Sequence, residues 1–239
     1  MILYPAIDLA GGRCVRLRQG KRGDVTDFGD PRDVARRWRD QGATWLHVVD
    51  LDAAFDGKSQ VEDLLRDLVK IFGGHVEIGG GLRTMEDIDR RMDAGFAACI
   101  LGSVAVSHPE IVEEACRRYP GKIVAGIDAR DGRVAVKGWV EKTDVDAVEF
   151  GKKMRAIGVR RAVYTDVSKD GMMQGPNIAA TRQMVQETGL EIVGSGGVSS
   201  MEDLQALTEI GCGGAILGRA MYDGFVDLRE AICRFRDAT

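Results

Sequence analysis

The sequence predicts an α/β protein, a single (β/α)8 TIM barrel built from two repeated (β/α)4 halves. Apolar segments rich in β-branched residues alternate with segments of helical periodicity from one end of the chain to the other. Eight such units follow one another with no linker or low-complexity segment, and 239 residues is a common length for this fold. Motifs of the first half also recur in the second at a nearly constant offset. These three observations favour one closed barrel.

The expected strands and helices alternate strictly. In the first half the patterns predict strands at 2–9, 45–49, 76–78 and 97–101, and helices at 33–41, 61–71, 85–94 and 109–118. In the second half they predict strands at 123–127, 161–165, 191–193 and 215–217, helices at 147–156, 177–187 and 228–235, and a further helix beginning at Met201. One domain is therefore expected over 1–239, with half-repeats of about 1–119 and 120–239. A doubly wound open sheet is the alternative, but it usually has about five or six strands.

The composition limits the classes of partner. With 44% hydrophobic and 29% charged residues, the chain is typical of a soluble globular protein. The net charge of −4 gives no reason to expect nucleic acid or an anionic membrane as a partner. No apolar run approaches the ~20 residues of a membrane span, and the chain enters a strand without a basic leader, so we expect a cytoplasmic protein. Five scattered cysteines without CxxC spacing indicate neither disulfides nor a zinc site.

A glycine-rich module occurs once in each half, at residues 77–87 and 194–203. Each copy follows an apolar strand and opens a helical pattern, so that several backbone N–H groups point at one spot that suits a phosphate. A neighbouring strand end, at Gly102 and at Gly218, completes each module, and the copies are 116 positions apart. Tight turns explain most single glycine motifs, but two copies in register favour a pair of phosphate sites. The residues expected to bind phosphate are Gly80, Gly81, Gly102, Ser103, Gly171, Gly196, Gly197, Gly218 and Arg219.

Two aspartates are placed for proton transfer. Asp8 ends the first strand and Asp128 ends the fifth, and in a barrel these ends face each other across the mouth, where active sites lie. One carboxylate would accept a proton while the other, kept protonated by its surroundings, donates one. The alternative is that each is a strand-end turn former or a helix cap. Thr165, at the end of the sixth strand, either hydrogen-bonds a reacting oxygen or is simply a β-branched strand residue.

Other polar and aromatic residues have further interpretations. Trp139, after the fifth strand, either stacks on a flat heterocycle or anchors its loop. A tryptophan loop that excludes water would raise the pKa of a nearby carboxyl group, which favours Asp128 as the acid and Asp8 as the base. We expect Asp50 and Asp52 to orient loops, and the basic cluster at residues 36–39 to be a solvated helix face. Structural roles are expected for the isolated histidines, which lack metal-ligand spacing: His47, His75 and His108.

Four motifs, together with both glycine modules, resemble the phosphoribosylformimino-5-aminoimidazole carboxamide ribotide isomerases of histidine biosynthesis. The motifs are PAIDL at 5–9, VRLRQG at 15–20, VDLDAA at 49–54 and TDVSKDG at 165–171. The resemblance covers essentially the whole chain. It implies a (β/α)8 fold and an Amadori rearrangement of an aminoaldose to an aminoketose, acting on a small molecule with a phosphate at each end. It also implies no metal, no organic cofactor and no obligatory protein partner.

The resemblance also assigns roles to individual residues. It implies that Asp8 is the base, that Asp128 is the acid and that Thr165 belongs to the catalytic site. Trp139 corresponds to the loop tryptophan that stacks on the ring of the substrate, and Gln19 is taken as a second substrate-binding residue. The two phosphate sites correspond to the two glycine modules.

Three alternatives stay open at this point. The sister cyclase of the same pathway is also a half-repeat barrel with two aspartates, but it carries a lysine where this chain has Arg16 and needs an ammonia-supplying partner. A bifunctional isomerase that also serves tryptophan synthesis shares most of these motifs and tends to carry an arginine where this chain has Lys137. The third alternative is a non-catalytic phosphosugar-binding barrel, which the joint presence of Asp8, Asp128 and Thr165 disfavours.

Overall fold

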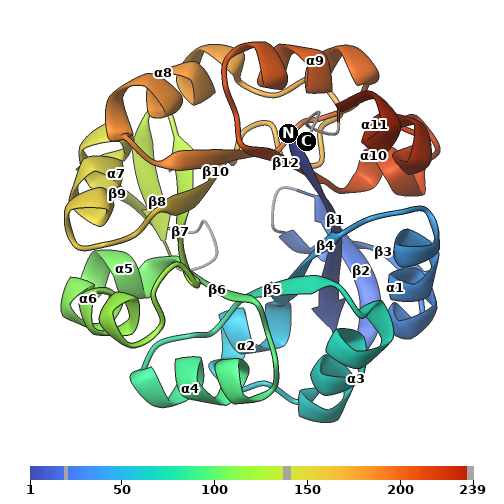
Figure 1. The fold of residues 1–239 in the computed structure, drawn as a ribbon, viewed down its shortest axis with the longest axis horizontal. Coiled ribbons are helices and arrows are strands. Elements are labelled where there is room, and N and C mark those ends of the chain that lie inside the picture. The colour runs from blue at the N-terminus through green and yellow to red at the C-terminus, as the bar shows by residue number, and fades with distance from the viewer. Residues whose placement is uncertain (19–20, 137–140, 236–239) are drawn as a thin grey trace.

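The computed structural model describes residues 1–18, 21–136 and 141–235, and its central feature is a ring of parallel strands surrounded by helices (Figure 1). Around the ring these strands are β1 (Ile2–Ala10), β4 (Trp45–Asp50), β5 (His75–Gly79), β6 (Ala98–Leu101), β7 (Ile123–Arg130), β10 (Arg161–Asp166), β11 (Glu191–Ser195) and β12 (Gly214–Leu217). The ring closes because β10 pairs with β7 and β12 pairs with β1, in parallel register. The predicted (β/α)8 barrel is therefore confirmed, and an open sheet is excluded.

Helices connect successive strands and cover the outside of the barrel (Figure 1). The helices of the described residues are α1 (Pro31–Asp40), α2 (Leu51–Asp56), α3 (Glu62–Phe72), α4 (Met85–Asp93), α5 (Ser103–Ser107), α6 (Pro109–Arg118), α7 (Ala147–Ala156), α8 (Ile178–Thr188), α9 (Met201–Glu209), α10 (Arg219–Tyr222) and α11 (Leu228–Phe235). The sequence predicts all of these except α2, α5 and α10, which are too short to show helical periodicity. Within the described ranges, no helix has the length and apolar character needed to cross a bilayer.

The half-repeat is visible in how helices begin after the glycine modules. Thr84 caps α4 and Ser200 caps α9, and each accepts a hydrogen bond from the backbone of the third helical residue, which is an aspartate in both cases. That aspartate, Asp87 or Asp203, accepts a bond from the backbone of the cap in return. Such a capping box satisfies two N–H groups at the start of a helix. The same device therefore fixes both module turns against their helices.

Two hairpin extensions at the mouth of the barrel are not predicted from the sequence. After β1, the chain forms β2 (Arg13–Arg18) and β3 (Lys21–Gly29), which are antiparallel. After β7, it forms β8 (Arg133–Val136) and β9 (Glu141–Asp146) in the same arrangement. Charged residues interrupt the apolar pattern in all four segments, so the strand signal is weak. Each hairpin nevertheless returns the chain to the strand end that carries an expected catalytic aspartate.

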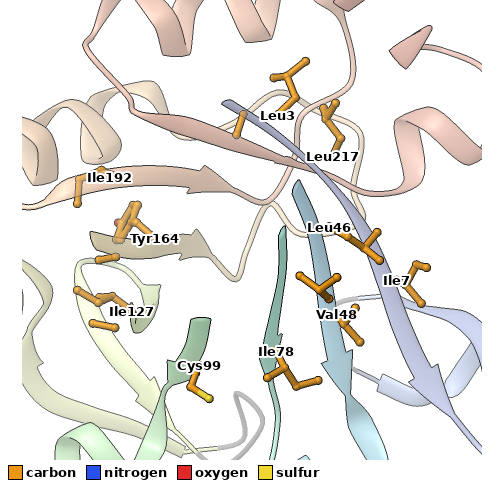
Figure 2. Packing of buried hydrophobic residues seen from close by; sticks show 14 of the residues in the cluster. Leu3, Ile7, Leu46, Val48, Ile78, Cys99, Ile127, Tyr164, Ile192 and Leu217 are labelled. Atoms are coloured by element: carbon orange, nitrogen blue, oxygen red, sulfur yellow. The ribbon is translucent and has the colours of Figure 1, made fainter. Parts of the chain in front are cut away.

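Side chains of the barrel strands alternate between two apolar clusters, as the period of a strand requires. One cluster lies between the strands and the helices, and Figure 2 labels members of it on β1, β4 and β5, among them Leu3, Ile7, Leu46, Val48 and Ile78. The other cluster fills the inside of the barrel, as the layered interior of this fold does. It consists of Tyr4, Ala6, Ala98, Ile100, Val124, Val163, Val193 and Ile216.

A polar network crosses the inside of the barrel below the mouth. Glu77 on β5 is fully buried, and its carboxylate lies 2.7 Å from Nδ1 of His47 and 3.4 Å from Nη2 of Arg161. Arg161 also donates to the hydroxyl of Tyr4 at 2.9 Å, and its guanidinium lies over the ring of Trp45. Burial, the largest effect, raises the pKa of Tyr4. The network thus holds one buried carboxylate against one mostly buried guanidinium, each with further partners.

We expect Glu77→Ala to lower the free energy of unfolding by about 3–5 kcal/mol, because removal of one partner leaves the charge of Arg161 buried without compensation. Chemical denaturation monitored by circular dichroism measures this change. The control is Glu113→Ala on α6, which removes an exposed i,i+4 pair with Arg117 and should cost at most about 0.5 kcal/mol. A similar small loss in both variants would contradict a stabilising network.

Candidate active site

A cavity of about 700 Å³ opens at the carboxyl ends of the barrel strands. Its floor includes inward side chains of the inner cluster, among them Ala6, Ile100 and Val163. In this fold the mouth at the carboxyl ends of the strands is where binding sites form. The expected catalytic and first-half phosphate residues all line it: Asp8, Asp128, Thr165, Gly80, Gly81, Gly102 and Ser103.

The first hairpin brings Arg16 to Asp8. Arg16 lies on β2, and its Nη1 donates to Oδ2 of Asp8 at 2.8 Å, while its Nη2 lies 3.6 Å from a carboxylate oxygen of Asp170. Burial alone would lower the pKa of Arg16, but the carboxylates of Asp8 and Asp170 outweigh it and raise that pKa above its usual value. Arg16 is therefore a permanently charged group that is clamped between two carboxylates. From the sequence, Arg16 only separates the isomerases from the cyclase, and no pattern there places it in the site.

Asp170 is a third acidic residue of the mouth, which the sequence analysis missed. It is buried in the turn after β10, and burial raises the pKa of its carboxyl group. The nearby carboxylates of Asp8 and Asp128 raise this pKa further, whereas Arg16 lowers it. The position 116 residues earlier is Ala54 in α2, and the second half has no helix there. The replacement of an alanine by an aspartate at this repeat position was the sequence signal that could have identified Asp170.

Asp128 and Thr165 are neighbours in the sheet. Asp128 lies at the mouth end of β7, and its Cα is in register with that of Thr165 on β10. Thr165 is 5% exposed and lines the same cavity as Asp128. The register places the hydroxyl-bearing residue beside the residue that carries the carboxylate.

The first phosphate-type grip, which we define as Gly80, Gly81, Gly102 and Ser103, has room for an anion beside it. Gly80 and Gly81 have φ values of 101° and 71°, and a Cβ on Gly81 would lie 2.5 Å from the carbonyl oxygen of Ala53. Only glycine therefore fits this turn. Gly102 precedes the first residue of α5, Ser103, so backbone N–H groups are directed to the mouth at this helix end. Both features suit phosphate binding.

The second phosphate-type grip, Gly171, Gly196, Gly197, Gly218 and Arg219, lines a separate hollow of only about 20 Å³. The guanidinium of Arg16 lies directly against Gly218, where any Cβ would collide with Nη2. The Nε of Arg16 is buried there without a hydrogen-bond partner among the described residues. The two hollows share four residues, namely Arg16, Asp170, Ser195 and Ile216, so the two grips belong to one continuous mouth.

The structure describes only some of the other residues that the sequence singles out. Gln19 and Trp139 lie outside the described residues, so their expected contacts stay predictions. Asp52 contacts a loop as expected, since its carboxylate accepts from the N–H of Gly11 at 2.8 Å, whereas Asp50 is the N-cap of α2 and accepts from the N–H of Ala53 at 2.9 Å. The arginines of the cluster at 36–39 are exposed as expected, while Trp38 between them is buried.

The histidines do not form a metal site. His47 bonds Glu77 but also lines the large cavity, His75 stacks on Trp45, and the ring of His108 lies 3.0 Å from the carboxylate of Glu110. Among the residues that the structure describes, no group of three or more potential ligands is arranged for a metal ion.

Sequence comparison identifies the relatives of this chain. Three relatives carry the name 1-(5-phosphoribosyl)-5-((5-phosphoribosylamino)methylideneamino)imidazole-4-carboxamide isomerase. The Paracoccus denitrificans protein is 50% identical over 234 residues, which cover 97% of this chain and 98% of the relative. The Thermodesulfovibrio yellowstonii protein is 48% identical (97% and 96% covered), and the Ruminiclostridium cellulolyticum protein is 46% identical (97% and 99% covered). Residues 2–227 match the family described as histidine biosynthesis protein, and the chain belongs to this family.

Proposed function

We propose that the protein is an aldose–ketose isomerase of histidine biosynthesis. Its substrate would be N'-((5'-phosphoribosyl)formimino)-5-aminoimidazole-4-carboxamide ribonucleotide, which an Amadori rearrangement converts to the ribulosyl isomer. The names of the relatives support this substrate. The observation that carries the proposal is one continuous mouth that contains three carboxylates between two glycine grips. An extended substrate with a phosphate at each end matches that arrangement.

The chemistry needs one acid and one base that are held at fixed places. Protonation of the ribose ring oxygen opens the sugar to a Schiff base, and removal of the C2 proton then gives an enolamine that becomes the ketone. Asp8 is the proposed base, because the ion pair with Arg16 keeps an acceptor oxygen at the mouth. Two phosphate contacts would hold the ends of the substrate and so position the reacting carbons.

Two residues are candidates for the acid. Asp128 is the acid that the sequence predicts, and it lies beside Thr165. Asp170 is the second candidate, because burial raises the pKa of its carboxyl group and so favours the protonated form that a donor requires. Thr165 would hydrogen-bond the reacting oxygen in either case.

The other parts of the proposal concern partners and location. No protein partner, nucleic acid or membrane is part of the proposed activity, and the tryptophan-pathway substrate of a bifunctional isomerase is a second candidate substrate on sequence motifs alone. We place the protein in the cytoplasm, which its unpaired thiols at Cys14, Cys99, Cys116, Cys212 and Cys233 support. Assays with both aminoaldose substrates test the activity and separate a single-function enzyme from a bifunctional one.

We expect Asp8→Asn and Asp128→Asn each to lower kcat by at least about 100-fold, which is typical for the loss of a positioned acid or base. Steady-state kinetics with the histidine-pathway substrate measure this. The matched control is Asp63→Asn, a highly exposed residue of α3 outside the mouth, which should keep the turnover of the wild type. Turnover near that of the wild type in either mouth variant would remove that residue from the proposed mechanism.

The pH profile distinguishes the two candidate acids. A donor must be protonated, so activity falls as the pH rises through its pKa, and the raised pKa of Asp170 moves this fall to higher pH than an ordinary carboxyl group gives. If Asp170 is the donor, we expect Asp170→Asn to lower kcat by about 100-fold and to abolish the basic limb of the kcat profile. An Asp170→Asn enzyme that retains this limb would assign the proton to Asp128.

Ser103→Asp tests the first grip without disturbing its turn. A carboxylate at the first residue of α5 suits the helix dipole, so the fold should persist. The same carboxylate would face a phosphate, and we expect KM to rise at least about tenfold because like charges then meet. Ser103→Thr, which adds no charge, serves as the control. An unchanged KM in a folded Ser103→Asp enzyme would argue against a phosphate at this grip.

A further inference from the structure

The two grips do not carry their arginines at equivalent positions. The second grip has Arg219 at the first residue of α10, and the position 116 residues earlier is Ser103. The first module has Arg83 two residues after Gly81, and the position 116 residues later is Ser199. Each half thus has one arginine and one serine at these two positions, but in exchanged order. Arg83 is not among the residues that the sequence predicts to bind phosphate.

The structure brings Arg83 to the first grip. Arg83 lines the large cavity together with Gly80, Gly81, Gly102 and Ser103. Its Nη2 donates to the carbonyl oxygen of Ala54 at 3.2 Å, and its Nη1 lies 2.5 Å from where a Cβ on Gly57 would be. The guanidinium is therefore held at the carboxyl end of α2, on the wall of the cavity, while the residue stays exposed to solvent.

Arg219 is held in a matching way in the second half. Its Nη1 lies 3.4 Å from the carbonyl oxygen of Gly171, in the turn that follows β10. Ala54, the acceptor for Arg83, lies in the segment that follows β4, and its repeat-equivalent is Asp170, the neighbour of Gly171. Two arginines from different repeat positions thus donate hydrogen bonds to carbonyl groups at nearly equivalent positions of the two halves. In each half, the guanidinium connects a glycine module to the segment that follows β4 or β10.

Arg219 has a carboxylate as an ion-pair partner, whereas Arg83 has none among the described side chains. The Nε of Arg219 pairs with Asp223 at 2.8 Å. No carboxylate of the described side chains lies within ion-pair distance of the Arg83 guanidinium. The other residues of the first grip, three glycines and Ser103, offer only backbone N–H groups and one hydroxyl. Arg83 therefore brings an uncompensated positive charge to the wall of an anion-type site.

We propose that Arg83 binds the substrate phosphate at the first grip, as the counterpart of Arg219 at the second. This inference rests on the proposed function, because it names the group that supplies the charge at one of its two phosphate sites. A phosphate monoester carries about −1.5 to −2 charges at neutral pH, and a guanidinium matches its oxygens with two parallel N–H donors. The backbone N–H groups orient the phosphate, and Arg83 neutralises it.

Arg83→Gln is the first test. We expect KM to rise about tenfold to hundredfold, because the variant loses a hydrogen bond to a charged phosphate. We expect kcat to change little, because the phosphate is bound equally well in the ground state and in the transition state. Arg90→Gln is the matched control, because Arg90 belongs to α4, makes only helix-surface ion pairs and does not line the cavity. A KM within about twofold of that of the wild type in Arg83→Gln would overturn the proposal.

Binding of inorganic phosphate gives a readout that does not depend on isomerisation. In an Arg219→Gln background, which weakens the second grip, thermal unfolding is followed against phosphate concentration, and the rise in Tm reports binding to the folded protein. We expect Arg83→Gln to need about tenfold more phosphate for the same rise. If the protein does not isomerise the substrate but this shift appears, the proposed function fails and the Arg83 site stands. An unchanged titration overturns the Arg83 site whatever the activity.

The exchanged order of arginine and serine provides a rescue experiment. The double variant Arg83→Ser/Ser103→Arg gives the first grip the arrangement of the second, with the arginine at the first residue of its short helix. We expect this variant to recover at least half of the phosphate affinity, on a logarithmic scale, that Arg83→Ser alone loses. A purely structural Arg83, which holds the loop at Ala54, would not be rescued from position 103, so failure of the rescue would count against the proposal.

Discussion

The ion pair between Arg16 and the carboxylates of Asp8 and Asp170 is the interaction on which the mouth of the barrel depends. Three acidic side chains converge there, those of Asp8, Asp128 and Asp170. The negative charges of the first two disfavour ionisation of the third. The buried guanidinium of Arg16 lies 2.8 Å from Asp8 and 3.6 Å from Asp170 and offsets part of this repulsion. Burial of Arg16 would be costly without these partners, and burial of the carboxylates would be costly without Arg16. The hairpin after β1 brings that charge to the mouth, because Arg16 lies on β2, which pairs with β1.

The duplicated fold supplies a symmetric frame, and the reaction needs an asymmetric one. Both halves supply a strand-end aspartate, a hairpin, a capping box and a glycine grip. The halves differ where α2 of the first half is replaced by the turn that carries Asp170, and where the arginine and serine of the grips are exchanged. The space beside the two grips also differs. Arg16 lies against Gly218 at the second grip, whereas the first grip lines the large cavity. A directional proton transfer becomes possible because these differences give the two carboxylates of the repeat unlike neighbours.

The sequence predicted the barrel and most of its mouth because both depend on short-range patterns. Strand and helix periods located the eight units, and the constant offset identified the two equivalent glycine turns at Gly81 and Gly197. Asp170 and Arg16 were missed for a physical reason: each acts through a partner that is distant along the chain and is brought near only by the closed barrel. The hairpins were missed because a strand pairing at the mouth, with one face in solvent and several charges, has little apolar signal.

The polar network inside the barrel adds a constraint that the mouth alone does not explain. His47 lines the cavity from below, and its Nδ1 is held by Glu77, which in turn faces Arg161 at the level of the opposite strands. These hydrogen-bonded charges lie among the apolar side chains of the inner cluster, and the Nε of Arg161 is buried there without a hydrogen-bond partner among the described residues. The strands that carry Asp8 and Thr165, β1 and β10, each contribute a side chain to this network, Tyr4 and Arg161, so hydrogen bonds as well as apolar packing constrain these two strands below the proposed site.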